Sequence, residues 1–581
     1  MLKRIISFFV SLLVLALILS SIGIPAFAAA SQSSAATDFT FKDGKMSKDV
    51  LRSYVSRAVT HQGFCIEGNG DNGGNVTFDE DLRFLRRIGA KYIGRAATLS
   101  WNGSMTKDEI ENHFKIAEEN AAKAHSADPE FILQAGIFEI AYKGTVESVK
   151  IPAYVFEAFG QKTEDRSFNW EKIVYPKGTK AVTGKDIGIG CWGKEDSGTP
   201  DIKQLETKMY FYYMITRYID AGYEAFHMGQ AELMMGYDAQ YSNHWQTLLN
   251  KAREYANKNA RRGLALFDCH TAITSGGIMV GNELVFDVQG AGMCPNETKT
   301  QDGAYKAELL HYKELDPERD DALSWVGRSS GGKHPLGFDI EENFTIIEFD
   351  NYGGNGSYGI ATKKAFYNWG FDDVTWFATQ PEWYRNQFLK ETAEYLATNT
   401  LCLDSEGKQQ YFLQPVTRRV ITPDLEKWYP KLTYTIGADA NEDFIFALAK
   451  DDSAEVSFND DGTCKITVKR IYRANRNGDG CPTGFNQEDT IREIFLGANA
   501  PEDPELTKVV LPVKYGGTGT VITPSITNPT PDADVIPDAG DLSVKADNSV
   551  MLWVVIAIAA ISAVAAVAVT VYVMSSNKKL T

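Results

Sequence analysis

Cysteine is scarce in this sequence and follows no pattern. Seven of the 581 residues are cysteine, and no C-x-x-C pair or regular spacing occurs among them. This scarcity excludes a disulfide framework and a cysteine-ligated zinc site as the basis of the fold. Cys464 and Cys481 flank an expected loop, and their spacing is compatible with one disulfide or with two free thiols.

Positive charge is also in short supply, and the short motifs that bind nucleotides or metals are missing. The formal net charge is -17 and the pI is near 5.1, with no basic patch. Such a chain is unsuited to nucleic acid or an anionic surface, so we expect no nucleic-acid partner. No glycine-rich phosphate loop follows an expected strand, and neither H-x-H nor HExxH occurs. We therefore expect no cofactor and no bound metal.

Long apolar runs are confined to the two ends of the chain. Residues 1–29 join a basic start to an apolar stretch that closes on Ala-Phe-Ala, the pattern of a secretory signal peptide. Residues 550–574 carry no charge and are long enough to cross a bilayer, and lysines follow in 575–581. These lysines place the tail in the cytoplasm. We expect the body of the protein on the extracellular face of the cell membrane, held by a single C-terminal helix.

The segment before this apolar run predicts a stalk. Residues 515–548 are rich in Thr, Pro and Asp, a composition typical of extended linkers. Ile536–Gly540 resembles a degenerate sortase signal of the LPxTG type, with Ile and Ala at its first and fourth positions. That resemblance implies cell-wall attachment as the alternative to plain membrane anchoring.

Strand-like and helix-like segments alternate between residues 48 and 400. Short apolar, β-branched runs are separated by amphipathic segments such as Asp79–Ile88, which Gly89 ends. This alternation predicts an α/β fold, a parallel (β/α)8 TIM-like barrel, and an open doubly wound sheet is the alternative. The strand candidates are 58–67, 91–101, 131–142, 223–235, 264–271, 283–290, 344–351 and 373–380.

The pattern of apolar and polar residues changes after residue 400. A turn at Asn459–Gly462 separates two runs of period-two alternation, which indicates a β-hairpin. Further short strand-like runs follow it. Residues 403–514 are therefore expected to form a smaller C-terminal β-sandwich-like domain.

Carboxylates stand near the ends of two expected strands. Glu348 ends the apolar run of FTIIEFDNYGG (Phe344–Gly354), with Asp350 and Asn351 close behind, and Glu232 lies near the end of the fourth expected strand. Since parallel strands of a barrel end at one rim, carboxylates from strands four and seven can face each other there. Cleavage of a glycosidic bond uses such a pair, one as proton donor and one as nucleophile.

This placement resembles the large clan of retaining glycoside hydrolases that carry an acid/base on strand four and a nucleophile on strand seven. The resemblance implies that Glu232 is the acid/base and Glu348 the nucleophile. It also implies that Arg95 keeps the nucleophile ionised and that Trp376 floors the sugar site. The resemblance covers the expected barrel alone, about three fifths of the chain.

One position departs from that clan. Its members place Asn directly before the acid/base, whereas this chain has Ala231 there and Gln230 one position earlier. Alternate residues of a strand share a side, so Gln230 and Glu232 are expected to face the barrel mouth together. Gln230 then substitutes for the missing Asn. The alternative is that Glu232 has another role, or that the protein binds glycans without cleaving them.

Other polar residues at strand ends are further candidates. Glu139, on the third expected strand, is either an acid/base or substrate contact or a supporting hydrogen-bond partner. Asp268 and His270 share one side of the fifth strand, a spacing that suits a general base or a metal ligand. His227 is interpreted as a barrel histidine with satisfied hydrogen bonds.

The sequence therefore predicts a cell-surface glycoside hydrolase acting on extracellular poly- or oligosaccharide. Aromatic residues make up 12% of the chain and occur near the expected strand ends, where they suit a carbohydrate groove. Two alternatives stay open. One is a catalytically inactive glycan-binding or adhesion protein, and the other is a metal-assisted hydrolase.

Overall fold

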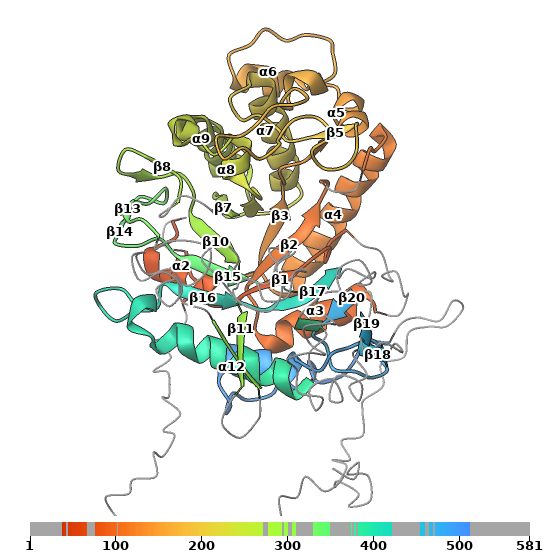
Figure 1. The fold of residues 1–581 in the computed structure, drawn as a ribbon, viewed down its shortest axis with the longest axis vertical. Helices are drawn as coiled ribbons and strands as arrows, with labels where there is room; N and C mark the ends of the chain where they lie inside the picture. Colours follow the sequence, from red (N-terminus) through yellow and green to blue (C-terminus); the bar gives the residue numbers. More distant parts are fainter. Residues whose placement is uncertain are drawn as a thin grey trace, which may run out of the picture. The chain divides into compact units, whose positions relative to one another are not determined.

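Parallel strands follow one another in chain order round the largest sheet of the structure (Figure 1). The structure is a computed structural model that describes residues 38–41, 45–66, 76–100, 103–270, 277–292, 295–299, 305–309, 329–348, 374, 377–378, 382–420, 454–458, 464–468 and 471–511. The strands of this sheet are β1 (Ala58–His61), β2 (Tyr92–Thr98), β3 (Ile132–Gly136), β6 (Ala225–His227), β7 (Leu266–His270), β10 (Val288–Gly292), β15 (Thr345–Glu348), β16 (Tyr411–Gln414), β17 (Val416–Val420) and β20 (Ile471–Arg473).

The last strand segment returns the sheet to its beginning. β16 pairs in parallel with β15, and β17 pairs in parallel with β1. Only Pro415 separates β16 from β17, and its carbonyl accepts a hydrogen bond from the backbone N–H of Thr60 at 3.0 Å. Residues 411–420 thus supply one broken strand with a neighbour on each side. The result is a curled parallel sheet of the TIM-like barrel type.

This strand replaces the one that the sequence predicts at 373–380. Val374, Phe377 and Ala378 are helical and buried, so that prediction is wrong for the residues described there. The first seven expected strands each contain an observed strand, although most observed strands are shorter. The fold class is confirmed at the level of a mixed α/β barrel-like sheet.

Each inward-facing apolar residue near the start of a strand is followed two positions later by a polar residue or a glycine. The apolar set packs together and against α2 (Lys48–Val55); it comprises Ala58, Tyr92, Ile132, Ala225, Leu266, Val288, Ile346 and Phe412. The set two positions on comprises Thr60, Gly94, Gln134, His227, Asp268, Gly290, Glu348 and Gln414. Because alternate strand residues share a side, the barrel interior changes from apolar to polar toward the carboxyl ends of the strands.

Helices connect most of the neighbouring strands and cover the outside of the sheet (Figure 1). Thr77 caps α3 and Gly89 ends it with a φ of 74°, and Thr106 and Glu109 form a capping box on α4. The principal helices are α3 (Phe78–Ile88), α4 (Lys107–Ala127), α5 (Lys143–Ser148), α6 (Ala153–Ala158), α7 (Leu205–Asp220), α8 (Ala231–Met234), α9 (Ser242–Asn259), α12 (Glu382–Thr398) and α15 (Glu488–Leu496).

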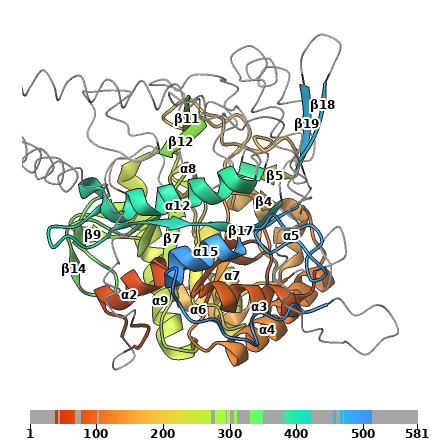
Figure 2. The same ribbon diagram turned by 90° about the horizontal axis from the view of Figure 1, so that it is seen from below.

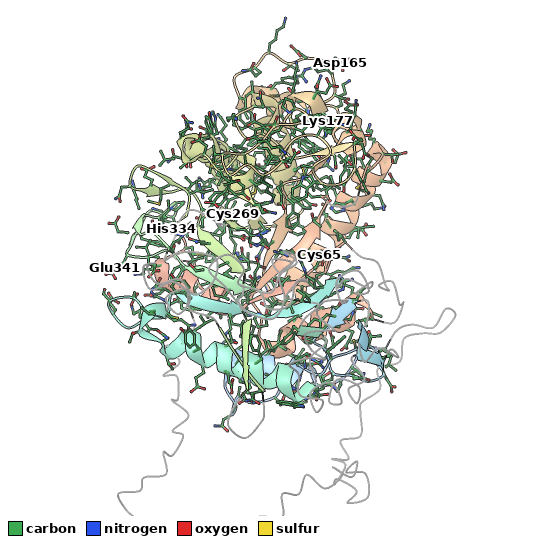
Figure 3. All side chains as sticks on the ribbon, in the orientation of Figure 1. Cys65, Asp165, Lys177, Cys269, His334 and Glu341 are labelled. Atoms are coloured by element: carbon green, nitrogen blue, oxygen red, sulfur yellow. The ribbon has the colours of Figure 1, made fainter. Side chains whose placement is uncertain are left out.

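Small, mostly antiparallel sheets take the place of helices after β7 and β10 in the described residues. Their strands are β8 (Met279–Val280), β9 (Glu283–Leu284), β11 (Pro295–Lys299), β12 (Tyr305–Leu309), β13 (Gly332–Lys333) and β14 (Asp339–Ile340). A further pair, β4 (Ala141–Tyr142) and β5 (Ser197–Gly198), brackets a long excursion from the sheet. Figure 3 shows Asp165 and Lys177 on the loops of this excursion and Cys269 within the barrel body.

The expected C-terminal β domain is only partly what the structure contains. β18 (Ala454–Phe458) and β19 (Cys464–Val468) form the expected antiparallel hairpin. However, β16 and β17 belong to the main sheet, and β20 extends that sheet by pairing with β17. The boundary drawn at residue 403 therefore falls before the strand that completes the barrel sheet.

Buried ion pairs join the C-terminal part to the helix layer. α15 lies against α3 (Figure 2). Arg83 of α3 donates to both carboxylate oxygens of Glu488 on α15, at 2.8 and 3.1 Å. Arg473 of β20 donates to Asp81 of α3 at 2.6 and 2.8 Å, and all four side chains are buried. Cys481 in the same region carries a free thiol in the structure.

The two chain ends that predict targeting lie outside the described residues. This applies to the signal peptide (1–29), the stalk (515–548), the apolar run (550–574) and the tail (575–581). Within the described part of the chain, no helix combines the length and apolar character needed to cross a bilayer.

Candidate functional site

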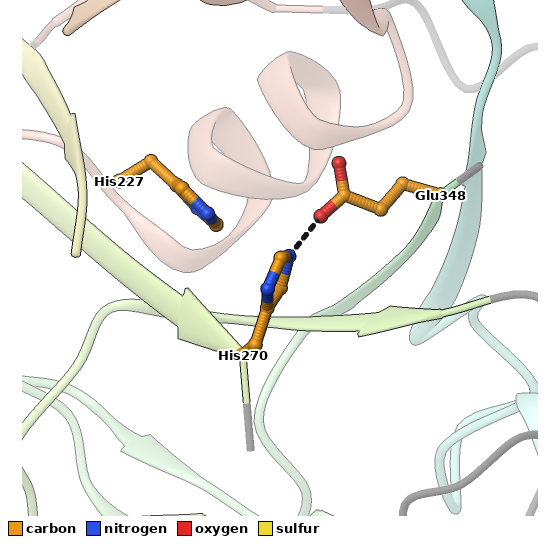
Figure 4. A group of neighbouring side chains, drawn as sticks. All are labelled: His227, His270 and Glu348. Carbon is orange, nitrogen blue, oxygen red and sulfur yellow. Dashed lines mark hydrogen bonds and ion pairs between the residues drawn. The ribbon is translucent and has the colours of Figure 1, made fainter. Parts of the chain in front are cut away.

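Three neighbouring side chains occupy the last positions of three strands of the main sheet. His227 ends β6, His270 ends β7 and Glu348 ends β15. A ring nitrogen of each histidine and a carboxylate oxygen of Glu348 lie within 4.8 Å of one another, and all three residues are buried. Figure 4 shows the three side chains converging on one point. This is the edge of a barrel at which active sites are built.

The Glu348 carboxylate is held from three strands. His270 Nε2 lies 2.5 Å from its Oε1, and Arg95 Nη2 of β2 donates to the same oxygen at 3.1 Å. Thr60 Oγ1 of β1 lies 3.5 Å from Oε2. Arg95 Nη2 also lies 3.3 Å from His270 Nε2. A carboxylate gripped in this way is fixed in position and paired with a positive charge.

Arg95 reaches this position through an unusual backbone conformation. Its φ of 56° lies in the left-handed region, which a residue with a Cβ adopts at a cost of about 1–3 kcal/mol. The register between β2 and β3 shifts between Ile93 and Ala97, and Gln134 Oε1 accepts the Arg95 N–H at 2.9 Å. Gly94 faces the barrel interior, so regular alternation would turn Arg95 outward. The bulge between Ile93 and Ala97 turns Arg95 inward instead.

Asp268 lies two residues before His270 on β7, and its carboxylate bonds the His227 ring. Its Oδ2 is 2.6 Å from His227 Nδ1, and its Oδ1 accepts from Gln134 Nε2 at 2.5 Å. Burial raises the pKa of Asp268 to about 8, and the negative charge of Glu348 adds to this rise. At neutral pH the Asp268 and His227 pair therefore retains a proton next to Glu348.

Glu139 and Gln230 bind each other rather than the Glu348 group. Glu139 follows β3, and its two carboxylate oxygens accept from the N–H and the Nε2 of Gln230 at 3.0 and 2.7 Å. Gly229, with a φ of 54°, packs closely against the Glu139 carboxylate. A Cβ at Gly229 would stand 2.1 Å from Glu139 Oε2. The side-chain amide of Gln230 is thus committed to Glu139.

Glu232 lies on a helix and not on a strand. β6 ends at His227, the chain turns at Gly229, and α8 begins at Ala231. The expectation that Gln230 and Glu232 share one strand face is therefore wrong, because residues two apart on a helix point to different sides. Glu232 is buried; burial raises the pKa of Cys269 and of Tyr237, and the charge of Glu232 adds to both shifts.

The structure brings only some of the sequence-predicted site residues together, and Glu232 lies apart from them on α8. Arg95, Asp268, His270 and Glu348 meet in one buried cluster, whereas Glu139 and Gln230 form a separate pair. Asp350, Asn351 and Trp376 lie outside the described residues.

The sequence interpretation missed the part that His227 and Gln134 play in the cluster. Both stand two positions after an inward-facing apolar residue, Ala225 and Ile132 respectively, and that spacing is the signal that identifies them.

The donor set of His227, His270 and Glu348 matches the ligands of a catalytic zinc ion, with Asp268 as the supporting partner of a histidine ligand. Arg95 opposes this use of the cluster. Its guanidinium Nη2 already lies against Glu348 Oε1 and His270 Nε2, two of the atoms that a cation would bind. The positive charge of Arg95 therefore competes with a divalent cation for the same donors.

Two small cavities lie elsewhere in the fold. One lies beside Cys269, Phe286 and Val288, and the other lies beside Leu99 and Tyr210. Glu348 lines neither of them.

No protein-family model and no curated protein matches this chain. Among solved structures it is similar to a debranching enzyme of Nostoc punctiforme soaked with acarbose, at 12% identity over 38% of this chain and 50% of that one, with a TM-score of 0.26. It is also similar to the cyclic alpha-maltosyl-(1→6)-maltose hydrolase of Arthrobacter globiformis in complex with maltose, at 11% identity over 41% and 56% of the two chains, with a TM-score of 0.26.

A third similar structure is the trehalose-6-phosphate hydrolase of Bacillus licheniformis, at 10% identity over 38% of this chain and 45% of that one, with a TM-score of 0.22. The matched region spans about half the length of each of these proteins. At such identities and TM-scores, the likeness does not indicate a shared activity.

Proposed function

We propose that this chain is a glycoside hydrolase of the retaining class, in which Glu348 is the nucleophile. The observation that carries the proposal is the position of Glu348 at the carboxyl end of its strand, bound by Arg95 and His270. A glycosidase nucleophile has to be ionised, fixed and directed at the anomeric carbon. A guanidinium at 3.1 Å and a histidine at 2.5 Å favour the ionised, fixed carboxylate.

The charge arrangement around Glu348 supports the same chemistry. Glycoside hydrolysis needs one ionised carboxylate and one group that still carries a proton near neutral pH. The raised pKa of Asp268, to about 8, supports this by keeping a proton close to Glu348 near neutral pH. The sequence predicts Glu232 as the proton donor, with Glu139 as a further candidate. Either residue would act in a retaining mechanism.

The substrate class is proposed from the same chemistry together with the two chain ends. We propose an extracellular oligo- or polysaccharide as substrate, because residues 1–29 resemble a signal peptide and residues 550–574 are apolar and long enough to cross a bilayer. Truncation after residue 549 should release the protein into the medium, whereas the full chain stays in the membrane fraction. Recovery of the full chain in the cytoplasm would contradict this location.

The test of the activity combines substitution with chemical trapping. Wild-type protein is assayed with α- and β-linked 2,4-dinitrophenyl glycosides and with a set of disaccharides. Glu348→Gln should lose about 10³-fold or more of kcat, while Glu394→Gln, an exposed control on α12, keeps full activity. A 2-deoxy-2-fluoro glycoside of the preferred sugar should add one sugar mass to the peptide that contains Glu348.

Two results would contradict the proposal. Turnover that survives Glu348→Gln removes Glu348 as nucleophile. Carbohydrate binding without turnover in the wild type, on any linkage, supports the glycan-binding alternative instead.

A metal-assisted hydrolase is the second candidate, because His227, His270 and Glu348 offer a plausible donor set. Metal analysis of purified protein and assays after EDTA treatment separate the two. The retaining mechanism predicts activity that is unchanged by EDTA. Loss of activity with EDTA and its return with Zn²⁺ would favour the metal mechanism.

A further inference from the structure

Asp268 and His227 form a hydrogen-bonded pair whose orientation is fixed on both sides. Asp268 Oδ2 lies 2.6 Å from His227 Nδ1, and Asp268 Oδ1 is bound by Gln134 Nε2 at 2.5 Å. Gln134 is itself held by the Arg95 N–H and bonded to the Tyr92 hydroxyl at 3.0 Å. With Nδ1 committed to Asp268, the imidazole presents Nε2 as the nitrogen for chemistry.

The imidazole of His227 faces the nucleophile. Figure 4 shows its nitrogen-bearing edge directed toward Glu348 and His270. The His227 and His270 rings lie 4.5 Å apart between centroids, and the donor atoms of His227, His270 and Glu348 lie within 4.8 Å of one another. Retaining glycosidases separate the proton donor and the nucleophile by about 5–5.5 Å. The donor atoms of His227 and Glu348 are therefore no more than 4.8 Å apart, somewhat closer than the two groups of such an enzyme.

We propose that His227, held by Asp268, is the proton donor and acceptor of the reaction, opposite Glu348. This inference rests on the proposed glycosidase function and differs from the sequence-based assignment of Glu232. In the first step a Glu348 oxygen forms a bond to the anomeric carbon as the bond to the leaving oxygen breaks, and the leaving oxygen takes the proton from His227 Nε2. In the second step His227 removes a proton from water, the hydroxide oxygen bonds to the anomeric carbon, and Glu348 leaves as carboxylate.

The charges that face His227 suit both steps. Asp268 and His270 face it from β7 and Glu348 from β15, and the Phe138 ring lies 5.3 Å from it between centroids. While Glu348 is ionised, its negative charge lies close to His227 and favours a proton on the pair. Ester formation at Glu348 removes that charge, and the pair then holds its proton less strongly.

The test measures how activity depends on the leaving group. His227→Asn retains a group that can bond Asp268 and removes Nε2. We expect it to lose about 10²–10⁴-fold of kcat/KM on the disaccharide that the wild type cleaves best, because that leaving group needs protonation. On the 2,4-dinitrophenyl glycoside of the same sugar, whose leaving group needs no proton, the loss should stay below about tenfold.

A second variant and matched controls guard against a merely structural effect. Asp268→Asn is nearly isosteric, and it should show the same dependence on leaving group with a smaller loss. His244→Asn, on the outer helix α9, and Asp339→Asn, on β14, should keep wild-type activity on both substrates. Circular dichroism and the melting temperature of each variant report whether it folds.

Outcomes that overturn the inference differ from those that overturn the glycosidase function. Equal losses on both substrates for His227→Asn and Asp268→Asn would remove His227 as proton donor. So would a loss confined to the disaccharide in Glu232→Gln or Glu139→Gln. Either result leaves the nucleophile test of Glu348 untouched, whereas full turnover in Glu348→Gln contradicts the underlying function itself.

Discussion

The guanidinium of Arg95 lies 3.1 Å from the carboxylate of Glu348, although 253 positions separate the two residues in the chain. Neither strand neighbours the other in the sheet, because β1 and the broken strand β16 and β17 lie between β2 and β15. The contact exists because the sheet curls until the inward faces of distant strands meet. The ion pair is thus a product of the barrel-like fold and also the centre of the proposed site.

Replacement of Arg95 should slow the reaction without abolishing sugar binding. Arg95→Met keeps most of the apolar stem and removes the charge beside Glu348, so we expect kcat to fall about 10²–10³-fold with a smaller change in KM. Steady-state kinetics on the 2,4-dinitrophenyl glycoside measure both parameters. Arg476→Met, an exposed arginine far along the chain, is the control. A loss confined to KM would show that Arg95 serves binding alone.

The raised pKa of Asp268 predicts a pH dependence of stability. In the unfolded chain Asp268 loses its proton near pH 3.8, whereas in the folded protein it does so near pH 8. The folded state therefore binds one proton more between these values, and the Asp268 contribution to the free energy of unfolding falls as pH rises from about 4 to about 8. Above pH 8 the contribution is constant.

Urea unfolding at several pH values measures this slope, and Asp268→Asn should flatten it. The comparison is made between pH 5 and pH 8, where few other carboxylates titrate. An identical slope in the wild type and in Asp268→Asn would contradict the prediction.

The buried pair of Asp81 and Arg473 should matter strongly for stability. Arg473 donates two hydrogen bonds to Asp81, and His61 Nε2 lies 3.3 Å from the same carboxylate. Asp81→Asn leaves Arg473 buried with its charge poorly compensated, which should cost about 3–5 kcal/mol of unfolding free energy. Chemical denaturation measures the loss. Asp108→Asn, in the exposed first turn of α4, should change stability little.

The same pair makes a prediction at acid pH. Its charge partners lower the pKa of Asp81 to about 2 even though burial opposes this. The stabilisation is therefore fully present above pH 3.8, and it is lost as pH falls toward 2. Acid titration of the wild type and Asp81→Asn, followed by circular dichroism, should show the variant losing less stability over that interval.

Gly94 should be intolerant of a side chain. A Cβ at this position would stand 2.6 Å from Gln414 Nε2 and 2.9 Å from the Val59 carbonyl oxygen. Gly94→Ala therefore crowds the place where β2 approaches the closing strand, and we expect a loss of about 1–3 kcal/mol. Gly478→Ala, where a Cβ meets open space, is the matched control. Equal melting temperatures for the two variants would contradict this packing argument.

Local pattern predicts most of the barrel strands and half of the site. The expected strands that contain β2, β7 and β15 have the right register, so Arg95, Asp268, His270 and Glu348 are recognisable before any coordinates. Their convergence follows from parallel strand ends meeting at one edge. The partner of each side chain does not follow, because a contact across the barrel depends on how tightly the sheet curls.

The failures also have physical causes. Pro415 lies in the middle of the closing strand, and a proline there normally argues against a central strand. It is tolerated because it marks the place where the strand changes partner. Glu232 was misplaced because the left-handed backbone of Gly229 ends the fourth strand earlier than its apolar pattern suggests. Because the strand ends there, Glu232 lies on α8 and not on β6.

The closing strand lies late in the sequence, which affects how the chain folds during synthesis. The Thr417 hydroxyl donates to the carbonyl of Thr60, 357 positions earlier in the chain. β1 can therefore pair with its second neighbour only after most of the polypeptide has been synthesised. Until then the nascent sheet has two unpaired edges, at β1 and β15, which are open to association with other chains. We expect slow folding and a need for protection during synthesis, because the last strands of this ring come late in the chain.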